Sequence, residues 1–206
     1  MKRDTPTHPS LLLRVRDARD EAAWSEFVSL YTPLIFGYCR GRGLTETDAS
    51  DVTQDSLKAI ALALPQFDYD PARSSFRNWL FTVVRSKLSN HFTAQARRPQ
   101  PAGETTIQHF AEVTPDSAAE DAWRREYQSH LVRWAADQIR GEFKHATWDA
   151  FWRTAVLGED AEAVARELGV SINALYIARS RVTGRLKQKI DELGDPLELA
   201  EAIRHG

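Results

Sequence analysis

Apolar residues recur at intervals of three and four along most of the chain, and this spacing is the strongest constraint on its fold. One clear example is the series Trp123, Tyr127, Leu131 and Trp134, spaced by four, four and three. Side chains at such intervals lie on one face of an α-helix, whereas a half-buried strand alternates every two residues. Because no segment alternates convincingly, the sequence predicts an all-α fold.

The helix boundaries follow from capping and turn residues. Asp20 is a suitable N-cap for a helix that runs to about residue 40, and Pro33 within it is expected to kink or interrupt that helix. Thr47 or Asp48 is expected to cap the next helix, which reaches about Leu64 with its apolar stripe on Leu57, Ile60, Ala61 and Leu64. Further helices are predicted at about 76–98, 145–157, 160–168 and 172–193, and a short one after Pro196.

A change of composition divides the chain in two. Between Pro99 and Asp121 there are three prolines and five acidic residues, with no arginine or lysine. Such a segment is typical of a linker. The sequence therefore predicts two small helical domains at residues 1–98 and 122–193, joined by an acidic linker at 99–121 and followed by a tail at 194–206.

The overall composition excludes several classes of protein. The formal net charge of −2 argues against indiscriminate binding of nucleic acid, although local basic patches remain possible. With Cys39 as the single cysteine, no intrachain disulfide can form. No apolar run approaches the roughly 20 residues of a membrane helix, and the N-terminus does not resemble a signal peptide. We expect a soluble, cytoplasmic protein with no membrane insertion.

Three carboxylates gather on one face of the predicted second helix. Asp48, Asp51 and Asp55 are spaced so that they cover about 60° of the helix circumference. Three interpretations are open: a solvated face, a carboxylate metal site, or a docking surface for a basic partner. A metal site would normally need a histidine or a second carboxylate helix nearby. The sequence offers neither at a suitable spacing.

The next segment has the opposite charge. From Pro71 to Gly103 there are six arginines and lysines and no acidic residue, with aromatic side chains interspersed. Phe76 and Trp79 are expected to belong to the core, together with Leu80, Val83 or Val84, Leu88 and Phe92. Cations beside aromatic rings are typical of surfaces that bind single-stranded or distorted nucleic acid.

Residues 159–190 have the layout of a helix-turn-helix. A short helix ends at Gly169, which suits a left-handed turn, Val170 fills the turn, and Ser171 caps a long second helix.

From Ser171 to Ile190 there are five arginines and lysines and no acid. The packing stripe is predicted on Ala174, Leu175, Ala178, Val182, Leu186 and Ile190. The opposite face carries Asn173, Tyr176, Ile177, Ser180, Arg181 and Lys187. An amphipathic hairpin with a merely cationic face is the plainer alternative, but Tyr176 and Ile177 suit base edges and thymine methyl groups in a major groove.

Together, residues 48–60, 76–99 and 163–186 resemble an extracytoplasmic-function sigma factor of the sigma-70 superfamily. Such proteins have two helical domains, region 2 and region 4, and act without catalytic chemistry. The resemblance implies promoter-specific initiation with core bacterial RNA polymerase, through the clamp helices of its largest subunit and the flap of the second largest, and an anti-sigma factor as regulator. The implied polymerase-binding residues are Asp48, Asp51, Gln54 and Asp55.

The resemblance also implies two sets of promoter contacts. A loop captures a flipped base of the −10 element and the following helix holds the melted strand, with the residues Asp68, Tyr69, Arg73, Ser74, Ser75, Arg77, Asn78, Arg85, Lys87 and Asn90. The helix-turn-helix binds the −35 element, with the residues Ser171, Asn173, Tyr176, Ile177, Ser180, Arg181 and Arg185. The sequence departs from common family residues at Ser86, Lys87, Asn90 and Tyr176, so base contacts cannot be copied from relatives.

Two other functional classes are weighed against this interpretation. A conventional helix-turn-helix regulator would use the first domain for a ligand or for dimerisation, and it should bind its duplex alone. An enzyme would need the carboxylates to bind metal, while the six histidines are scattered. We expect no catalytic residue, metal or cofactor.

Overall fold

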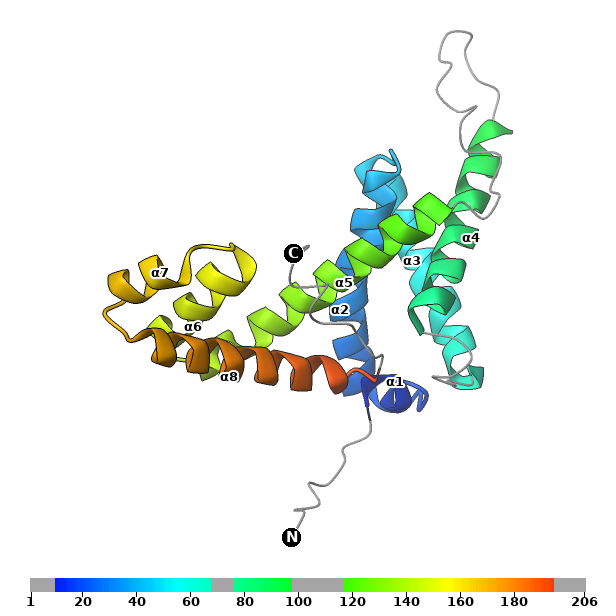
Figure 1. Cartoon of the computed structure of the whole chain (residues 1–206). Helices are drawn as coiled ribbons and strands as arrows, with labels where there is room; N and C mark the ends of the chain where they lie inside the picture. The colour runs from blue at the N-terminus through cyan, green and yellow to red at the C-terminus, as the bar shows by residue number, and fades with distance from the viewer. Residues whose placement is uncertain (1–9, 68–75, 98–116, 195–206) are drawn as a thin grey trace, which may run out of the picture. The chain divides into compact units, whose positions relative to one another are not determined.

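The computed structural model describes residues 10–67, 76–97 and 117–194 of the chain. Every regular element in these ranges is a helix, in agreement with the predicted all-α fold (Figure 1). The chain divides into two compact units. The first unit is Arg14–Glu126, and the second comprises Met1–Leu13 and Tyr127–Gly206.

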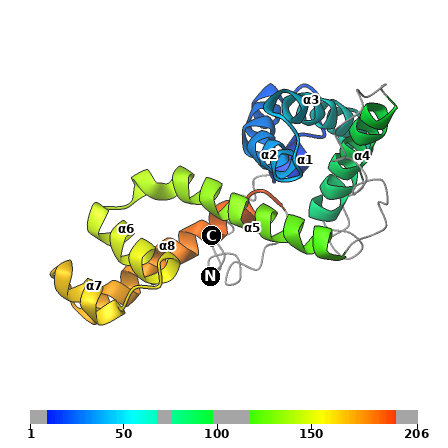
Figure 2. The same cartoon turned by 90° about the horizontal axis from the view of Figure 1, so that it is seen from above.

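Three long helices build the first unit. They are α2 (Glu21–Gly41), α3 (Glu46–Ala63) and α4 (Phe76–Ala96), and a 3-10 turn at Leu64–Gln66 follows α3. Helix α3 packs against both α2 and α4, and the three helices lie together in both views (Figures 1 and 2).

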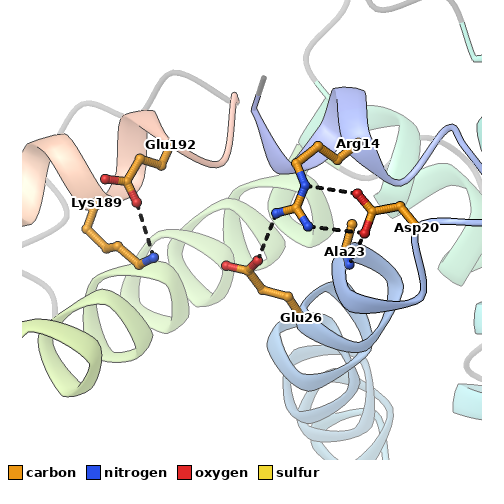
Figure 3. A network of polar contacts seen from close by, with 6 residues as sticks. All are labelled: Arg14, Asp20, Ala23, Glu26, Lys189 and Glu192. Carbon is orange, nitrogen blue, oxygen red and sulfur yellow. Dashed lines mark hydrogen bonds and ion pairs between the residues drawn. The ribbon is translucent and has the colours of Figure 1, made fainter. Parts of the chain in front are cut away.

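The start of α2 is fixed by two sets of contacts. Asp20 caps the helix as predicted, because its carboxylate accepts a hydrogen bond of 2.8 Å from the Ala23 N–H. Arg14, the last residue of the short helix α1 (Leu11–Arg14), donates to the same carboxylate and pairs with Glu26 at 3.5 Å (Figure 3). The hydrogen bonds from Arg14 and Ala23 lower the pKa of Asp20. Pro33 lies inside α2, which continues as one helix of 21 residues.

The cap of α3 differs from the prediction. Thr45, and not Thr47 or Asp48, is the N-cap, and its hydroxyl accepts a hydrogen bond of 3.1 Å from the Asp48 N–H. The earlier start of α3 changes little of its packing, because residues in the middle of the helix, and not the cap, determine which side is buried. The buried side of α3 is, however, rotated from the predicted stripe. Leu57 is half-buried and Ala61 is exposed, and the buried residues of the helix are Ala49, Val52, Thr53, Ser56 and Ile60.

Aromatic rings fill the core of the first unit. Phe27, Tyr31 and Phe76 are fully buried with ring centroids 4.5–6.0 Å apart, as aromatic pairs prefer. Trp79 packs on the edge of this cluster, 5.5 Å from Phe76, which agrees with its predicted core role. Cys39 is also buried, and burial raises the pKa of its thiol to about 11.

Trp123 completes the same core from outside the predicted first domain. It lies in α5 (Ser117–Ile139) and is 1% exposed. Its ring lies 4.9 Å from that of Tyr38 and 5.5 Å from that of Phe81, and its indole N–H donates to the Arg77 carbonyl at 3.2 Å. The predicted linker at 99–121 therefore overlaps the first turn of α5, and the N-terminal part of this helix belongs to the first unit.

The second unit contains the rest of α5 and three more helices. They are α6 (His145–Phe151), α7 (Ala161–Glu167) and α8 (Ile172–Asp191). A 3-10 turn at Arg140–Glu142 precedes α6, and a π-helical turn at Trp152–Val156 follows it, so the helix predicted at 145–157 is α-helical only in its first half. The hydrophobic core joins α5, α6 and α8, with Ile139, Phe151 and Val182 at most 1% exposed.

Segments from the two ends of the chain also meet in the second unit. The Leu11 N–H donates to the Glu192 carbonyl at 3.0 Å, and the Leu12 N–H donates to the Leu193 carbonyl at 3.3 Å. Both leucines are buried. Residues 10–13 therefore pack on the end of α8, although the sequence placed residues 1–98 in one domain. The contact joins residues about 180 positions apart, which no local pattern could reveal. No helix among the described residues has the length and apolar character needed to cross a bilayer.

Two glycines of the helix-turn-helix provide a stability test with opposite signs. Gly184 lies inside α8 with open space where a Cβ would stand, whereas Gly169 has a φ of +65°. We expect Gly184→Ala to stabilise the chain by about 0.5–1 kcal/mol, because alanine is the better helix former. Gly169→Ala should destabilise it by about 1–2 kcal/mol, because an L-residue is strained in the left-handed region. Urea unfolding of both variants measures these shifts, and equal signs would contradict the turn geometry.

Candidate functional site

The exposed side of α3 is acidic. Asp51 and Gln54 are exposed, and so is Asp55, which pairs with Lys58 at 3.2 Å. That pair joins two side chains that are more than 60% exposed, so it contributes little stability and leaves the carboxylate accessible. Asp51, Asp55 and Lys58 are spaced by four and three, which places them along one line of the helix surface.

Asp48 has a different environment from the other predicted polymerase-binding residues. Its carboxylate accepts a hydrogen bond of 2.7 Å from the Thr45 hydroxyl, and it lies 3.9 Å from His91 Nε2. The side chain is only 33% exposed. Asp48 therefore helps to close the start of α3, and the accessible acidic face of α3 consists of Asp51, Gln54 and Asp55.

Leu62, which is not among the predicted site residues, also lies on this face. Its side chain is 80% exposed, the highest value among the exposed large hydrophobic residues that the structure describes. At about 100° per residue it falls on the same line as Asp51 and Asp55. Helical projection alone could have found it, because a leucine on the acidic side of an amphipathic helix breaks the pattern.

The predicted −10 residues are only partly within the described ranges. The loop residues Asp68, Tyr69, Arg73, Ser74 and Ser75 lie outside them. Arg77, Asn78, Arg85, Lys87 and Asn90 lie on α4. Asn78 and Asn90 are exposed, while the other three are half-buried.

The side chains of α4 do not form one basic face. Leu80, Val84 and Leu88 form the buried side of the helix. Arg85 and Lys87 lie on opposite flanks, about 160° apart at 100° per residue. A nucleic acid backbone that followed one flank of α4 would therefore contact only one of these two cations. The core residues agree with the prediction for Phe76, Leu80, Val84 and Leu88, whereas Val83 and Phe92 are only half-buried and the buried Phe81 was not predicted.

The helix-turn-helix has the predicted local structure. Asp160 caps α7, Gly169 has a left-handed φ, and the Ser171 hydroxyl accepts a hydrogen bond of 3.2 Å from the Ala174 N–H. Val170 packs on the small core formed by Val164, Ala165 and Leu175. The turn is therefore held by the residues that the sequence indicated.

The outer face of α8 agrees largely with the prediction. Leu175, Val182, Leu186 and Ile190 are buried, but Ala174 is exposed and leaves the packing stripe. Burial of the small alanine methyl group would contribute little hydrophobic free energy. Burial of the neighbouring Leu175 therefore determines which side of α8 faces the core. The exposed face displays the residues Asn173, Tyr176, Ile177, Ser180, Arg181 and Lys187.

Arg185 is engaged within the protein. Its guanidinium donates two hydrogen bonds to the Glu142 carboxylate, at 2.7 and 2.8 Å, and lies 3.5 Å from Glu192. These hydrogen bonds lower the pKa of Glu142. Glu192 also pairs with Lys189 at 3.2 Å (Figure 3). Arg185 thus connects α8 to the turn before α6, and Ser171 acts as a helix cap, which gives both predicted −35 residues structural roles.

A comparison of two arginines on α8 tests which of them is available for DNA and which has a structural role. Arg181 is exposed and makes no ion pair with another described residue. We expect Arg181→Ala to weaken binding of duplex DNA and to lower the salt dependence by about one counterion, without changing stability. Arg185→Ala should lower the unfolding midpoint, because Glu142 loses its partner. Salt titrations of DNA binding in the presence of core RNA polymerase, and urea unfolding of both variants, measure the difference, and exchanged phenotypes would contradict the assignment.

Comparison with known families and proteins adds independent information. Residues 27–98 match the family model of sigma-70 region 2. The ECF RNA polymerase sigma factor RpoE of Cereibacter sphaeroides is 29% identical over 100 residues, which cover 48% of this chain and 54% of that protein. The chain thus spans about half the length of this relative. The ECF RNA polymerase sigma factor SigD of Mycobacterium tuberculosis is 27% identical over 183 residues, or 86% of this chain and 82% of SigD.

Two solved structures can also be compared with the chain. SigE of Rhodobacter sphaeroides, in complex with the anti-sigma ChrR, is 24% identical and covers 86% of this chain and 94% of its own, with a TM-score of 0.36. CnrH in complex with the cytosolic domain of CnrY is 23% identical and covers 88% of this chain and 95% of its own, with a TM-score of 0.34.

Proposed function

We propose that the chain is an extracytoplasmic-function sigma factor of the sigma-70 superfamily and that it directs core bacterial RNA polymerase to a class of promoters. It acts by binding and positioning rather than by catalysis, in the cytoplasm. The observation that carries the proposal is the separation of charge within one small unit. Helix α3 exposes carboxylates, while the adjacent α4 carries arginine and lysine without any acid.

The acidic face of α3 is proposed as the polymerase-docking surface. Asp51, Gln54 and Asp55 present two carboxylates and one amide from a helix of 18 residues that packs on both sides. A rigid helix holds such groups in fixed positions, which favours a specific partner. Opposite charge on the partner, which we take to be the clamp helices of the largest subunit, would increase the association rate and fix the orientation.

Helix α4 and the loop before it are proposed to hold the melted −10 strand. Phe76 is buried and Trp79 half-buried, so their rings support the helix from the core side. Arg85 and Lys87 contribute charge from the two flanks of the helix and the exposed Asn78 and Asn90 contribute hydrogen-bonding groups. We assign base capture to the loop residues 68–75.

Helix α8 is proposed as the −35 reading helix, with residues 99–116 as the linker to region 4. The residues assigned to DNA contact are Asn173, Tyr176, Ile177, Ser180 and Arg181. Ser171 and Arg185 support the helix, as described above. We further propose that region 4 contacts the flap of the second largest subunit and that an anti-sigma factor restrains the free chain, as ChrR binds SigE in the solved complex.

Retention of DNA from a randomised, promoter-length duplex pool tests the proposal. Three samples are compared: the chain alone, core RNA polymerase alone, and both together. With a net charge of −2, the chain alone should retain little DNA, and only the mixture should enrich two conserved elements. Enrichment of one element by the chain alone would instead favour a conventional helix-turn-helix regulator. An unenriched pool in the mixture would reject both.

A further inference from the structure

The outer face of α8 displays two adjacent large apolar side chains. Tyr176 is 51% exposed and Ile177 is 52% exposed. The other exposed large hydrophobic residues among those described are Leu13, Leu62 and Leu157, and none of these is next to another. A single exposed apolar residue needs no explanation, whereas a group of them indicates a contact surface.

The surroundings of Ile177 indicate what this surface contacts. Asn173 precedes Ile177 by four residues and Arg181 follows it by four, so all three lie along one line of the helix. Ser180 lies beside them, and all four side chains are exposed. From Ser171 to Ile190 there are five arginines and lysines and no acidic residue. This composition is complementary to a polyanion with hydrogen-bonding groups and a local apolar surface.

Duplex DNA offers this combination in its major groove. The C5 methyl of thymine is the apolar group that the base pairs present there, and isoleucine can pack against it. Asparagine can bond adenine through two atoms, and arginine can bond guanine in the same way. Helix α8 therefore carries, within about two turns, three side chains that can each contact one kind of base: Asn173 for adenine, Ile177 for thymine and Arg181 for guanine.

Position on the helix distinguishes Ile177 from Tyr176. Ile177 lies near the middle of the exposed face, between Asn173 and Arg181 and opposite the buried side of α8, while Tyr176 is turned about 100° toward one flank. A side chain at the flank of a recognition helix is closer to the sugar-phosphate backbone than to the base edges. The tyrosine hydroxyl would then contact phosphate, which leaves Ile177 as the residue that reads a base.

We infer that Ile177 recognises thymine methyl groups in the −35 element, within a sequence read on either side by Asn173 and Arg181. This inference rests on the proposed function, because it takes α8 to be the −35 reading helix. It adds a chemical specificity that the family alone does not give. The −35 element of this chain should contain at least one thymine whose methyl group, rather than its pairing edge, contributes to affinity.

Deoxyuridine substitution tests the inference, because deoxyuridine lacks only the methyl group. The −35 element is first identified by selection with the full chain bound to core RNA polymerase. Each thymine in it is then replaced singly by deoxyuridine, and the affinity of the complex is measured by competition. We expect one or two substitutions to weaken binding about three- to five-fold, as for the loss of one buried methyl group.

Two variants assign the effect to Ile177. Ile177→Ala should bind the thymine duplex as weakly as wild type binds the deoxyuridine duplex, and deoxyuridine should then have no further effect. Leu157→Ala, which removes an exposed leucine outside α8, should retain the full deoxyuridine effect.

The outcomes separate the inference from the proposed function. A selected −35 element without deoxyuridine sensitivity in wild type, or with full sensitivity in Ile177→Ala, overturns the inference and leaves the sigma-factor function intact. The absence of any selected element in the presence of core polymerase rejects the proposed function itself. Unchanged DNA affinity in Ile177→Ala would show that the side chain does not contribute to DNA binding, which also overturns the inference.

Discussion

Replacement of Asp51 by arginine is expected to abolish binding to core RNA polymerase while the fold remains intact. Asp51 lies within α3, away from its ends, and its side chain is exposed. The substitution therefore changes the surface and not the core. The new cation would face the basic partner that the acidic face is proposed to bind. Like charges brought together at an interface cost several kcal/mol, which corresponds to an affinity loss of about a hundred-fold or more.

A graded series makes this prediction specific. Asp51→Asn removes the charge but keeps the shape, and it should give an intermediate loss of core binding. Asp137→Arg introduces the same change of net charge at an exposed position of α5 in the second unit, and it should bind core normally. Affinity is measured by titrating labelled chain with core polymerase, and circular dichroism checks the fold. If Asp51→Arg bound as tightly as Asp137→Arg, the docking face would be wrongly assigned.

Replacement of Trp123 by alanine is expected to be the most destabilising change in the first unit. The ring is 1% exposed between Tyr38 and Phe81, and its N–H donates to the Arg77 carbonyl. Truncating a buried tryptophan to alanine costs about 3–5 kcal/mol, a large fraction of the roughly 5–15 kcal/mol that stabilises a typical domain. Urea unfolding should therefore show a large shift, and amide exchange in α2 and α4 should accelerate.

Trp24 provides a matched control for this prediction. It is half-buried on α2 and stacks on Phe27 with a centroid distance of 5.4 Å. Because Trp24 leaves part of its ring in water, Trp24→Ala should destabilise the first unit less than Trp123→Ala. Equal losses, or faster exchange confined to the second unit in Trp123→Ala, would contradict the placement of Trp123 in the first unit.

The sequence could predict features that depend on nearby residues. The helical class, the Asp20 and Ser171 caps and the left-handed turn at Gly169 all follow from residues within a few positions of each other. The exposed face of α8 follows from helical periodicity alone. Helical spacing also placed Asp51 and Asp55 together on the solvent side of α3, although it did not show that Asp48 is partly covered and that the buried side is rotated from the predicted stripe.

The sequence could not predict contacts between distant residues. Arg185 meets Glu142 across 43 residues, and Trp123 meets Arg77 across 46. In each case the side chain alone is ambiguous: an arginine on a basic helix resembles a DNA contact, and a tryptophan after an acidic linker resembles the start of the next domain. Only packing decides between these alternatives. The caps of α3 show a smaller ambiguity, since Thr45, Thr47 and Asp48 are all suitable N-cap residues and lie within one turn.

Run-off transcription with purified core enzyme measures whether the chain directs promoter-specific initiation. A template carrying the two elements selected by the chain and core together is transcribed with and without the chain, and with the Asp51→Arg variant. We expect a single run-off product of defined length that requires the wild-type chain and disappears with Asp51→Arg. A transcript of equal yield without the chain, or no promoter-specific transcript when the wild-type chain is present, would contradict it.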